Sequence, residues 1–368
     1  MEVFVGSKHL NVSVSTAHDV TGREHLVVVA KATWSIPSPG QRPRPLPAQP
    51  LSHTDHFTGA PGMSALRYGC DIYRFKPRCD LLFDACAQAP EGKPVRHLGV
   101  GFRVGPLTKA LNVCGRRYWR KTLGGFVLST PEPFTRMPLH YDLAFGGSHA
   151  YRLRNGEELH ETFLENPVGI GWAGRHSLDQ LANAPAPSLE ALDDPIRRPD
   201  ATHRPMALGA LGRQWPMRLR YAGTCDEHWQ QNVFPFMPDD FDERFHQVAP
   251  EDQQMDFPQG GEDVVLLNLV PGRPDVRFHL PALKHMPVRI LRKDYSTHTA
   301  NAVVDTLFFE TEQQRFSAVW RTSTPILRRI QEFGSIAIGP VDPQWWRGKT
   351  LGIEGCSTCG QSAGSTGA

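Results

Sequence analysis

Few residues of this chain have the types and spacing that chemistry requires, and the clearest pair is Cys356 and Cys359. Their spacing is that of half a zinc site or of a redox dithiol. Zinc would need two further ligands at matching spacing, and a redox motif normally opens a helix that follows a strand; the sequence supplies neither context. We interpret the two thiols as incidental residues of a loose tail.

Another thiol, Cys225, lies three positions before His228, so a nucleophile activated by an imidazole is one interpretation. Neighbours in sequence do not provide the spatial geometry of a catalytic triad. We favour the alternative that Cys225 is a small apolar residue where a strand end turns into a loop. The sixteen histidines show no paired spacing typical of metal ligands on a helix. The sequence therefore predicts no metal site.

Acidic and glycine-rich segments complete the candidates. Asp239, Asp240 and Asp242 lie together but lack the ligand spacing of an EF-hand, so they are typical of caps for a helix that begins near Asp242. Residues 260–263 predict a turn that enters a buried strand. Residues 169–174 nearly match a dinucleotide-binding loop, but no apolar strand precedes them. We expect a protein that is not an enzyme and uses no cofactor.

Composition limits the partners. Lys and Arg number 40 against 38 Asp and Glu, so no positive field favours nucleic acid or an anionic membrane. No apolar run approaches the roughly 20 residues that span a bilayer, and the first ten residues do not resemble a signal peptide. Seven cysteines, an odd and sparse set, argue against a secreted disulfide framework. We expect a cytoplasmic protein with no nucleic-acid and no membrane partner.

Alternation of polar and apolar residues predicts the elements that would position a site. One hairpin is expected from residues 11–15 to 28–34, and a second from 98–104 to 109–113. The same period recurs at 276–280 and 315–321. The expected fold class is mainly β: a large antiparallel β-sandwich-like domain with long Pro- and Gly-rich loops and a few short helices.

Pro and Gly residues predict how the chain is divided. We expect a β-rich domain over residues 1–321, with a Pro-rich surface loop at 37–50 and a loop-rich middle at 131–258. Short helices are predicted at 179–192, at 240–248 and most clearly at 325–333, which has Pro325 in its first turn and Gly334 beyond its end. Residues 322–352 would hold a C-terminal helix and docking segment, and residues 353–368 a flexible tail.

A series of short phrases carries a resemblance to a known family, from about residue 20 to about residue 320. The phrases are residues 31–34, Lys76 and Pro77 with Asp80, Val104 and Gly105 with Lys109, Val113, 115–119, 133–134, 137–139, Tyr141, 144–147, 166–169, Trp215, Arg218, 222–224, 238–241, 252–253 and 261–262. In this order they resemble the bacterial domain-of-unknown-function family 2169 (DUF2169). Two departures are Cys225, where an aromatic residue is expected, and Arg116, where an acidic residue is more usual.

The resemblance implies an adaptor or chaperone, because members of the family are encoded among type VI secretion genes. It implies binding of a cognate effector in the cytosol and its delivery to the VgrG or PAAR-tipped spike. Most of the phrases are interpreted as scaffold, with Trp34, Trp119, Phe134, Phe145 and Trp215 in the core. A carbohydrate-active or other hydrolase on a β-sandwich, built from the acidic segments 226–229 and 239–242, is one alternative, and a structural part of the secretion apparatus is another.

The tryptophan pair near the chain end is the candidate protein-binding site. Trp345, Trp346 and Arg347 combine the aromatic and guanidinium groups that are over-represented among interface hot spots. Packing of the terminal segment onto the domain is an equally good explanation of the pair.

Overall fold

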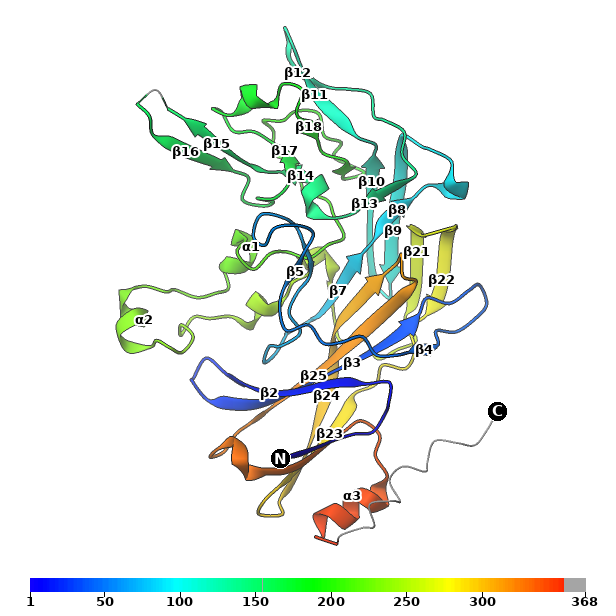
Figure 1. Ribbon diagram of the computed structural model, residues 1–368, viewed down its shortest axis with the longest axis vertical. Coiled ribbons are helices and arrows are strands. Elements are labelled where there is room, and N and C mark those ends of the chain that lie inside the picture. Colours follow the sequence, from blue (N-terminus) through cyan, green and yellow to red (C-terminus); the bar gives the residue numbers. More distant parts are fainter. Residues whose placement is uncertain (154, 354–368) are drawn as a thin grey trace.

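Strands dominate the computed structural model, which describes residues 1–153 and 155–353 (Figure 1). The predicted mainly β fold with a few short helices is confirmed. The α-helices of the described part are α1 (Pro216–Leu219), α2 (Glu227–Asn232) and α3 (Pro343–Thr350). Its 3-10 turns are η1 (Pro90–Gly92), η2 (Tyr141–Leu143), η3 (Leu178–Leu181), η4 (Glu243–His246), η5 (Glu251–Gln253) and η6 (Ile330–Glu332).

A ten-stranded sheet forms the larger layer, with a main path in the order β1-β26-β23-β24-β25-β3-β2. Its strands are β1 (Glu2–Val5), β2 (Asn11–His18), β3 (Glu24–Ser35), β4 (Pro45–Leu46), β7 (Cys79–Asp84), β20 (Gln254–Met255), β23 (Met286–Arg292), β24 (Thr297–Glu310), β25 (Arg315–Pro325) and β26 (Phe333–Ile338). Most pairs are antiparallel, but β7 runs parallel to β24 and β1 parallel to β26.

A five-stranded antiparallel sheet forms the second layer, in the order β19-β10-β9-β21-β22. Its strands are β9 (His97–Val104), β10 (Leu107–Cys114), β19 (Leu189–Glu190), β21 (Asp263–Val270) and β22 (Arg273–His279). Aromatic rings join the layers: Phe83 of β7 stacks on Phe102 of β9 at 4.5 Å, and Phe278 of β22 lies 5.6 Å from Phe316 of β25. Burial of such side chains contributes roughly 1.5–3 kcal/mol each, so this contact layer holds the sandwich together.

Smaller strand pairings lie at one end of the sandwich and within the loops (Figure 1). They comprise β11 (Arg117–Thr122) with β12 (Gly125–Leu128) and β18 (Pro185–Ala186); β8 (Cys86–Gln88) with β13 (Arg136–Pro138); β14 (Phe145–Gly146) with β17 (Ile170–Gly171); β15 (Ser148–Arg152) with β16 (Glu158–Thr162); and β5 (His56–Phe57) with β6 (Leu66–Tyr68).

Both predicted hairpins are confirmed. Strand β2 pairs with β3 through Val14 opposite Val28, and β9 pairs with β10 through Val104 opposite Leu107. The Pro-rich loop differs in one detail, because its residues Pro45–Leu46 form β4 and pair with β3. Residues 260–263 turn into β21, as the sequence predicts.

The helix predicted at 325–333 is wrong. Strand β25 continues to Pro325, which pairs with His25, and a loop with the single turn η6 leads directly into β26. The Glu332 side chain holds this loop by accepting hydrogen bonds from the backbone N–H groups of Leu327 at 3.0 Å and Arg328 at 2.9 Å. The helix lies further on, as α3, where Pro343 occupies the first turn and Asp342 caps the N–H of Gln344.

The two other predicted helices are shorter than expected. Residues 179–192 contribute only η3 before the chain becomes β18 and β19, and residues 240–248 contribute η4. Asp242 caps η4 by accepting a hydrogen bond from the N–H of Arg244, so the predicted capping role is confirmed for this residue. Asp240 accepts from Thr224 instead.

Candidate polypeptide-binding surface

A projecting segment, residues 222–241, leaves the domain after α1 and returns just before η4 (Figure 1). We call it the arm. It carries α2 and then Phe234 and Phe236, whose exposed fractions are 65% and 43%. Pro235 between them is also exposed. Exposed aromatic residues on a projection are typical of surfaces that bind another polypeptide.

Hydrogen bonds inside the arm hold it in one shape. Asp226 caps α2 by accepting from the N–H of Trp229 at 2.9 Å, and the indole Nε1 of Trp229 donates to the Phe236 carbonyl at 2.9 Å. Asp240 accepts from the N–H of Thr224 at 2.8 Å and from its hydroxyl at 2.7 Å. The aromatic residues are therefore presented on ordered backbone, which lowers the entropy cost of binding.

The two ends of the arm meet at a cationic clamp. The guanidinium groups of Arg220 and Arg244 lie over the Tyr221 ring, at 4.7 and 4.3 Å from its centroid. The Asp242 N–H donates to the Tyr221 carbonyl at 3.0 Å. Gly223 follows with φ +79°, and a Cβ there would come within 2.7 Å of Pro238. This close approach explains why a glycine stands at the base of the arm.

Buried charges fasten the chain on either side of the arm, and one of them, Asp80, belongs to the large sheet. Arg218, only 3% exposed, donates to the Phe245 and Leu211 carbonyls at 2.7 and 3.0 Å. Asp80 of β7 is fully buried and accepts from the Lys76 ammonium at 2.8 Å and from the Gln247 amide at 2.5 Å. It also accepts from the N–H groups of residues 248 and 249. The arm thus projects from a fixed base.

One histidine of this base is held neutral. Burial first, and then nearby cations with Arg218 foremost, lower the pKa of His246 to about 3. Its ring stacks on Tyr73 with centroids 4.9 Å apart. Nε2 lies 3.6 Å from a Glu243 carboxylate oxygen, but the ring is neutral near pH 7, so we treat this contact as polar packing and not as an ion pair.

Both acidic segments noted in the sequence lie on the arm or at its base. Asp226, Asp240 and Asp242 each accept local hydrogen bonds. The N–H and hydroxyl of Thr224 lower the pKa of Asp240, and the Arg244 guanidinium lowers that of Asp242. A general acid needs the opposite shift. These carboxylates therefore have structural roles that do not favour a paired acid and base at this place.

Comparison with known protein families decides where the chain belongs. Residues 21–321 match the family DUF2169, described as an uncharacterized protein conserved in bacteria. The chain belongs to the DUF2169 family. Comparisons with curated proteins and with solved structures give no significant match. The arm lies inside the part matched by the DUF2169 family, whereas α3 lies outside it.

The DUF2169 phrases lie mainly in the scaffold, as the sequence predicts. Trp119, Phe134, Phe145 and Trp215 are buried. Trp34 is partly buried against the core cluster that contains Phe134 and Trp215, whereas Trp119 and Phe145 lie in a separate cluster. Lys109, from another phrase, donates to Asp252 at 3.0 Å and Gln253 at 2.8 Å. Exposed residues of these phrases are Thr224, Asp239 and Asp240 at the two ends of the arm, and Arg116, Pro133, Asp252 and Gly261 elsewhere.

Cys225 lies exposed just before α2, so the prediction of a small apolar residue at a strand end is wrong. This departure from the expected aromatic residue therefore lies outside the core. A thiol does meet an imidazole elsewhere: Cys114 Sγ lies 3.4 Å from His97 Nδ1. Burial raises the pKa of Cys114 to about 12, so the thiol is protonated at neutral pH. The contact follows from the predicted hairpin, because the register of β9 with β10 places His97 opposite Cys114.

The predicted binding residues lie on α3. Trp345 and Trp346 are half-buried and Arg347 is exposed. Trp345 meets Phe4 of β1 edge-on at 4.7 Å, and Lys349 of the same helix pairs with Glu2 at 3.3 Å. Terminal packing therefore accounts for much of Trp345. Cys356 and Cys359 lie outside the described residues.

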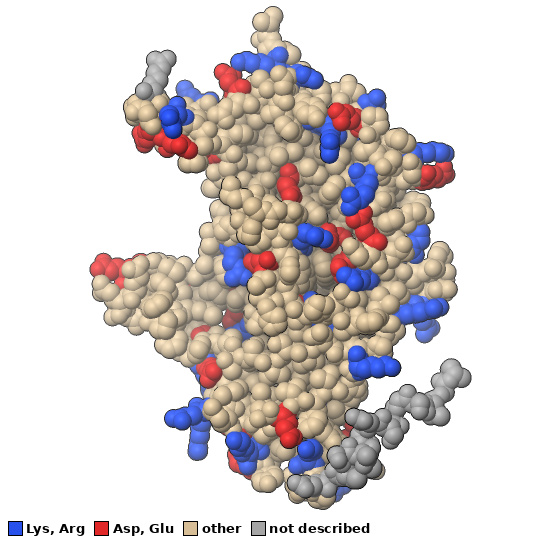
Figure 2. Space-filling model, viewed as in Figure 1, with Lys and Arg blue, Asp and Glu red and all other residues tan. Residues whose placement is uncertain are grey.

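A recess lies beside the arm. Figure 2 shows it between the arm and the β15–β16 hairpin, with acidic side chains on both projections. Glu157 and Glu158 are exposed on the hairpin, and Asp226 and Glu227 on the arm. The described residues contain no group of three or more His, Cys, Asp or Glu that could hold a metal ion. Among the helices of the same residues, none is long and apolar enough to cross a membrane.

Proposed function

We propose that this DUF2169 protein is a cytoplasmic adaptor that binds a type VI secretion effector and helps load it onto the VgrG or PAAR-tipped spike. The observation that supports this most is the arm, which holds exposed Phe234 and Phe236 on ordered backbone. The secretion context is what the sequence resemblance implies, and it is part of the proposal. The contact is made by the aromatic side chains, and the acidic rim of the recess selects a partner segment with basic residues.

The anchoring of the arm fits a loading factor. Its base is fixed by Asp80, Arg218 and the clamp around Tyr221, so the arm needs no ordering when a partner binds. Trp346 and Arg347 on α3 form a second, smaller candidate contact. No chemistry on a substrate is required.

Co-purification with an effector encoded beside this gene tests the proposal. The wild-type chain should retain the effector, and the double variant Phe234→Ser, Phe236→Ser should recover roughly tenfold less. A matched control replaces Leu123 and Val127, exposed on the β11–β12 hairpin, with serine. An effector whose stability and secretion do not change when this gene is deleted would contradict the proposal. Stoichiometric amounts of the protein in secreted spikes would favour a structural part instead.

A further inference from the structure

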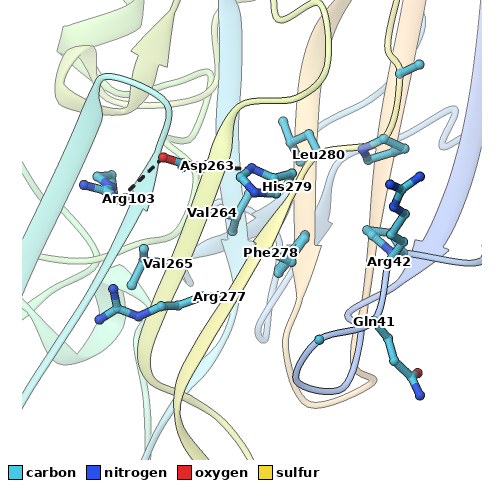
Figure 3. Close-up of a pocket in the computed structure, with 14 residues that line it drawn as sticks. Gln41, Arg42, Arg103, Asp263, Val264, Val265, Arg277, Phe278, His279 and Leu280 are labelled. Carbon is cyan, nitrogen blue, oxygen red and sulfur yellow. Dashed lines mark ion pairs between the residues drawn. The ribbon is translucent and has the colours of Figure 1, made fainter.

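A groove of about 800 Å³ runs along strand β22, between this strand and the Pro-rich loop (Figure 3). Strand β22 ends the five-stranded sheet and pairs only with β21 among the described strands. The opposite wall includes residues 40–43 of the loop, and Pro281 and Ala282 continue the lining. A smaller groove of about 300 Å³ extends it toward Arg273. An unpaired strand edge thus faces an open channel.

The hydrogen-bonding direction of β22 follows from its neighbour. The Leu280 N–H donates to the Glu262 carbonyl, and the Leu280 carbonyl accepts from the Gly261 N–H, both at 3.0 Å. Residue 280 therefore faces β21, and backbone direction alternates along an antiparallel strand. Asp275, Arg277 and His279 accordingly direct their N–H and C=O groups into the groove. Pro274 belongs to the other set of residues, whose backbone groups face β21. Its missing N–H therefore removes no donor from this open edge.

The side chains of β22 alternate between the two faces of the sheet. Val276 and Phe278 are buried toward the core, whereas Asp275, Arg277 and His279 are exposed on the other side. Figure 3 shows Arg103 and Arg277 on one side of the groove and Arg42 across it. A strand added here would alternate in the same way, with one face against Phe278, Leu280 and Pro43 and the other beside the arginines.

The charges favour an acidic occupant. Four arginines line the groove and its extension, Arg42, Arg103, Arg273 and Arg277, against two aspartates, Asp263 and Asp275. Both aspartates already have partners: Asp263 lies 2.9 Å from His279 and 3.8 Å from Arg103, and Asp275 lies 2.9 Å from Arg277. Arg273 donates to the Pro37 carbonyl and to Gln314. Arg42 has no hydrogen-bond or ion-pair partner within the described residues.

From these observations we infer that β22 accepts an extended segment of a partner polypeptide, alternating acidic and apolar residues, as an additional strand of the five-stranded sheet. Backbone hydrogen bonds to Arg277 and His279 provide affinity, and the arginines select acidic side chains. The inference rests on the proposed function for the identity of the partner, and it adds a contact of opposite charge to that of the arm.

A peptide assay tests the groove without an effector. The probe is a labelled seven-residue peptide of alternating glutamate and valine, matched to the seven residues of β22, titrated with the full chain and followed by fluorescence anisotropy. We expect saturable, salt-sensitive binding, weakened roughly tenfold by Arg42→Glu with Arg277→Glu. The control variant carries Arg175→Glu and Arg328→Glu, exposed arginines outside the groove lining, and should bind normally.

Two further peptides separate strand pairing from charge attraction. They have the same side chains but methylated backbone nitrogens, one on the odd residues and the other on the even residues. The peptide whose methylated nitrogens face β22 should not bind, whereas the other methylated peptide should still bind. Equal binding of all three peptides, or no saturable binding to the wild-type chain, would overturn the inference. Effector co-purification is measured separately, so an effector that binds while the peptide does not would leave the proposed function intact and remove only the groove.

Discussion

The arm and the buried layer beneath its base use side chains in opposite ways. In the buried layer, charged groups such as Lys76 and Asp80 lie 2% and 0% exposed and fasten loops to the sheet. On the arm, Phe234 is 65% exposed and polar groups bond the local backbone. Polar groups inside and apolar groups outside reverse the usual distribution. The difference indicates that the buried charges fix a shape, and that the arm is the part shaped for contact.

The largest expected effect comes from the buried layer. Replacing Asp80 with alanine leaves the Lys76 charge buried without its partner and removes the acceptor for residues 247–249. We expect the free energy of unfolding to fall by about 3–5 kcal/mol, measured by urea denaturation. Asp239→Ala, at an exposed arm position, should change it by less than about 0.5 kcal/mol. Similar midpoints for the two variants would remove the distinction between the regions.

A pH dependence comes next. The pKa of His246 is about 3 in the folded protein, below its ordinary value of 6.5, so the unfolded state binds the extra proton between these values. Stability from this group is complete above pH 6.5 and falls as pH drops, by roughly 1.4 kcal/mol per unit. Between pH 7 and 4.5 the wild type should lose roughly 2–3 kcal/mol more than His246→Phe, which keeps an aromatic ring on Tyr73. An equal pH dependence of the free energy of unfolding in the two proteins would show that this histidine is not held neutral.

A smaller effect is expected within the arm. Asp226→Ala removes the cap of α2 and should cost about 1 kcal/mol locally, seen as faster amide hydrogen exchange in residues 227–232. The global free energy of unfolding should stay within about 0.5 kcal/mol of wild type, because the arm contributes little to the core. A large global loss would mean that the arm is part of the folding unit and not a projection from it.

The smallest effect on stability is expected at the exposed rings themselves. Phe234→Ser should change the free energy of unfolding by less than about 0.5 kcal/mol, because the ring is already in contact with water. The same change should weaken partner binding strongly. A clear loss of stability in thermal unfolding would place the ring among structural residues and weaken the comparison.

The sequence predicted the parts of this fold that are local. Hairpins β2–β3 and β9–β10 were visible because one face of each strand is buried, which imposes a period of two. The bond between Gln247 and Asp80 spans 167 positions, and no local pattern encodes it. Strand β7 reaches β24 in the same non-local way. Pro325 and Gly334 imitated helix boundaries, although the residues between them serve as a loop from β25 to β26.

The candidate surface was only partly predictable. The acidic segments were noticed, but their meeting on one arm depends on the clamp at Tyr221. Phe234 and Phe236 follow no helical or strand period, so nothing in the sequence separated them from core residues. The tryptophan pair on α3 stood out by composition, yet Trp345 rests on Phe4.

Site-specific photocrosslinking in cells tests whether the arm itself contacts the effector. A benzophenone amino acid replaces Phe234 on the arm, and in a matched strain it replaces Leu123 on the β11–β12 hairpin, another exposed apolar position. If the arm binds the effector, position 234 crosslinks to the effector encoded nearby and position 123 does not. Efficient crosslinking at position 123, with none at position 234 while the effector still co-purifies, would contradict this prediction.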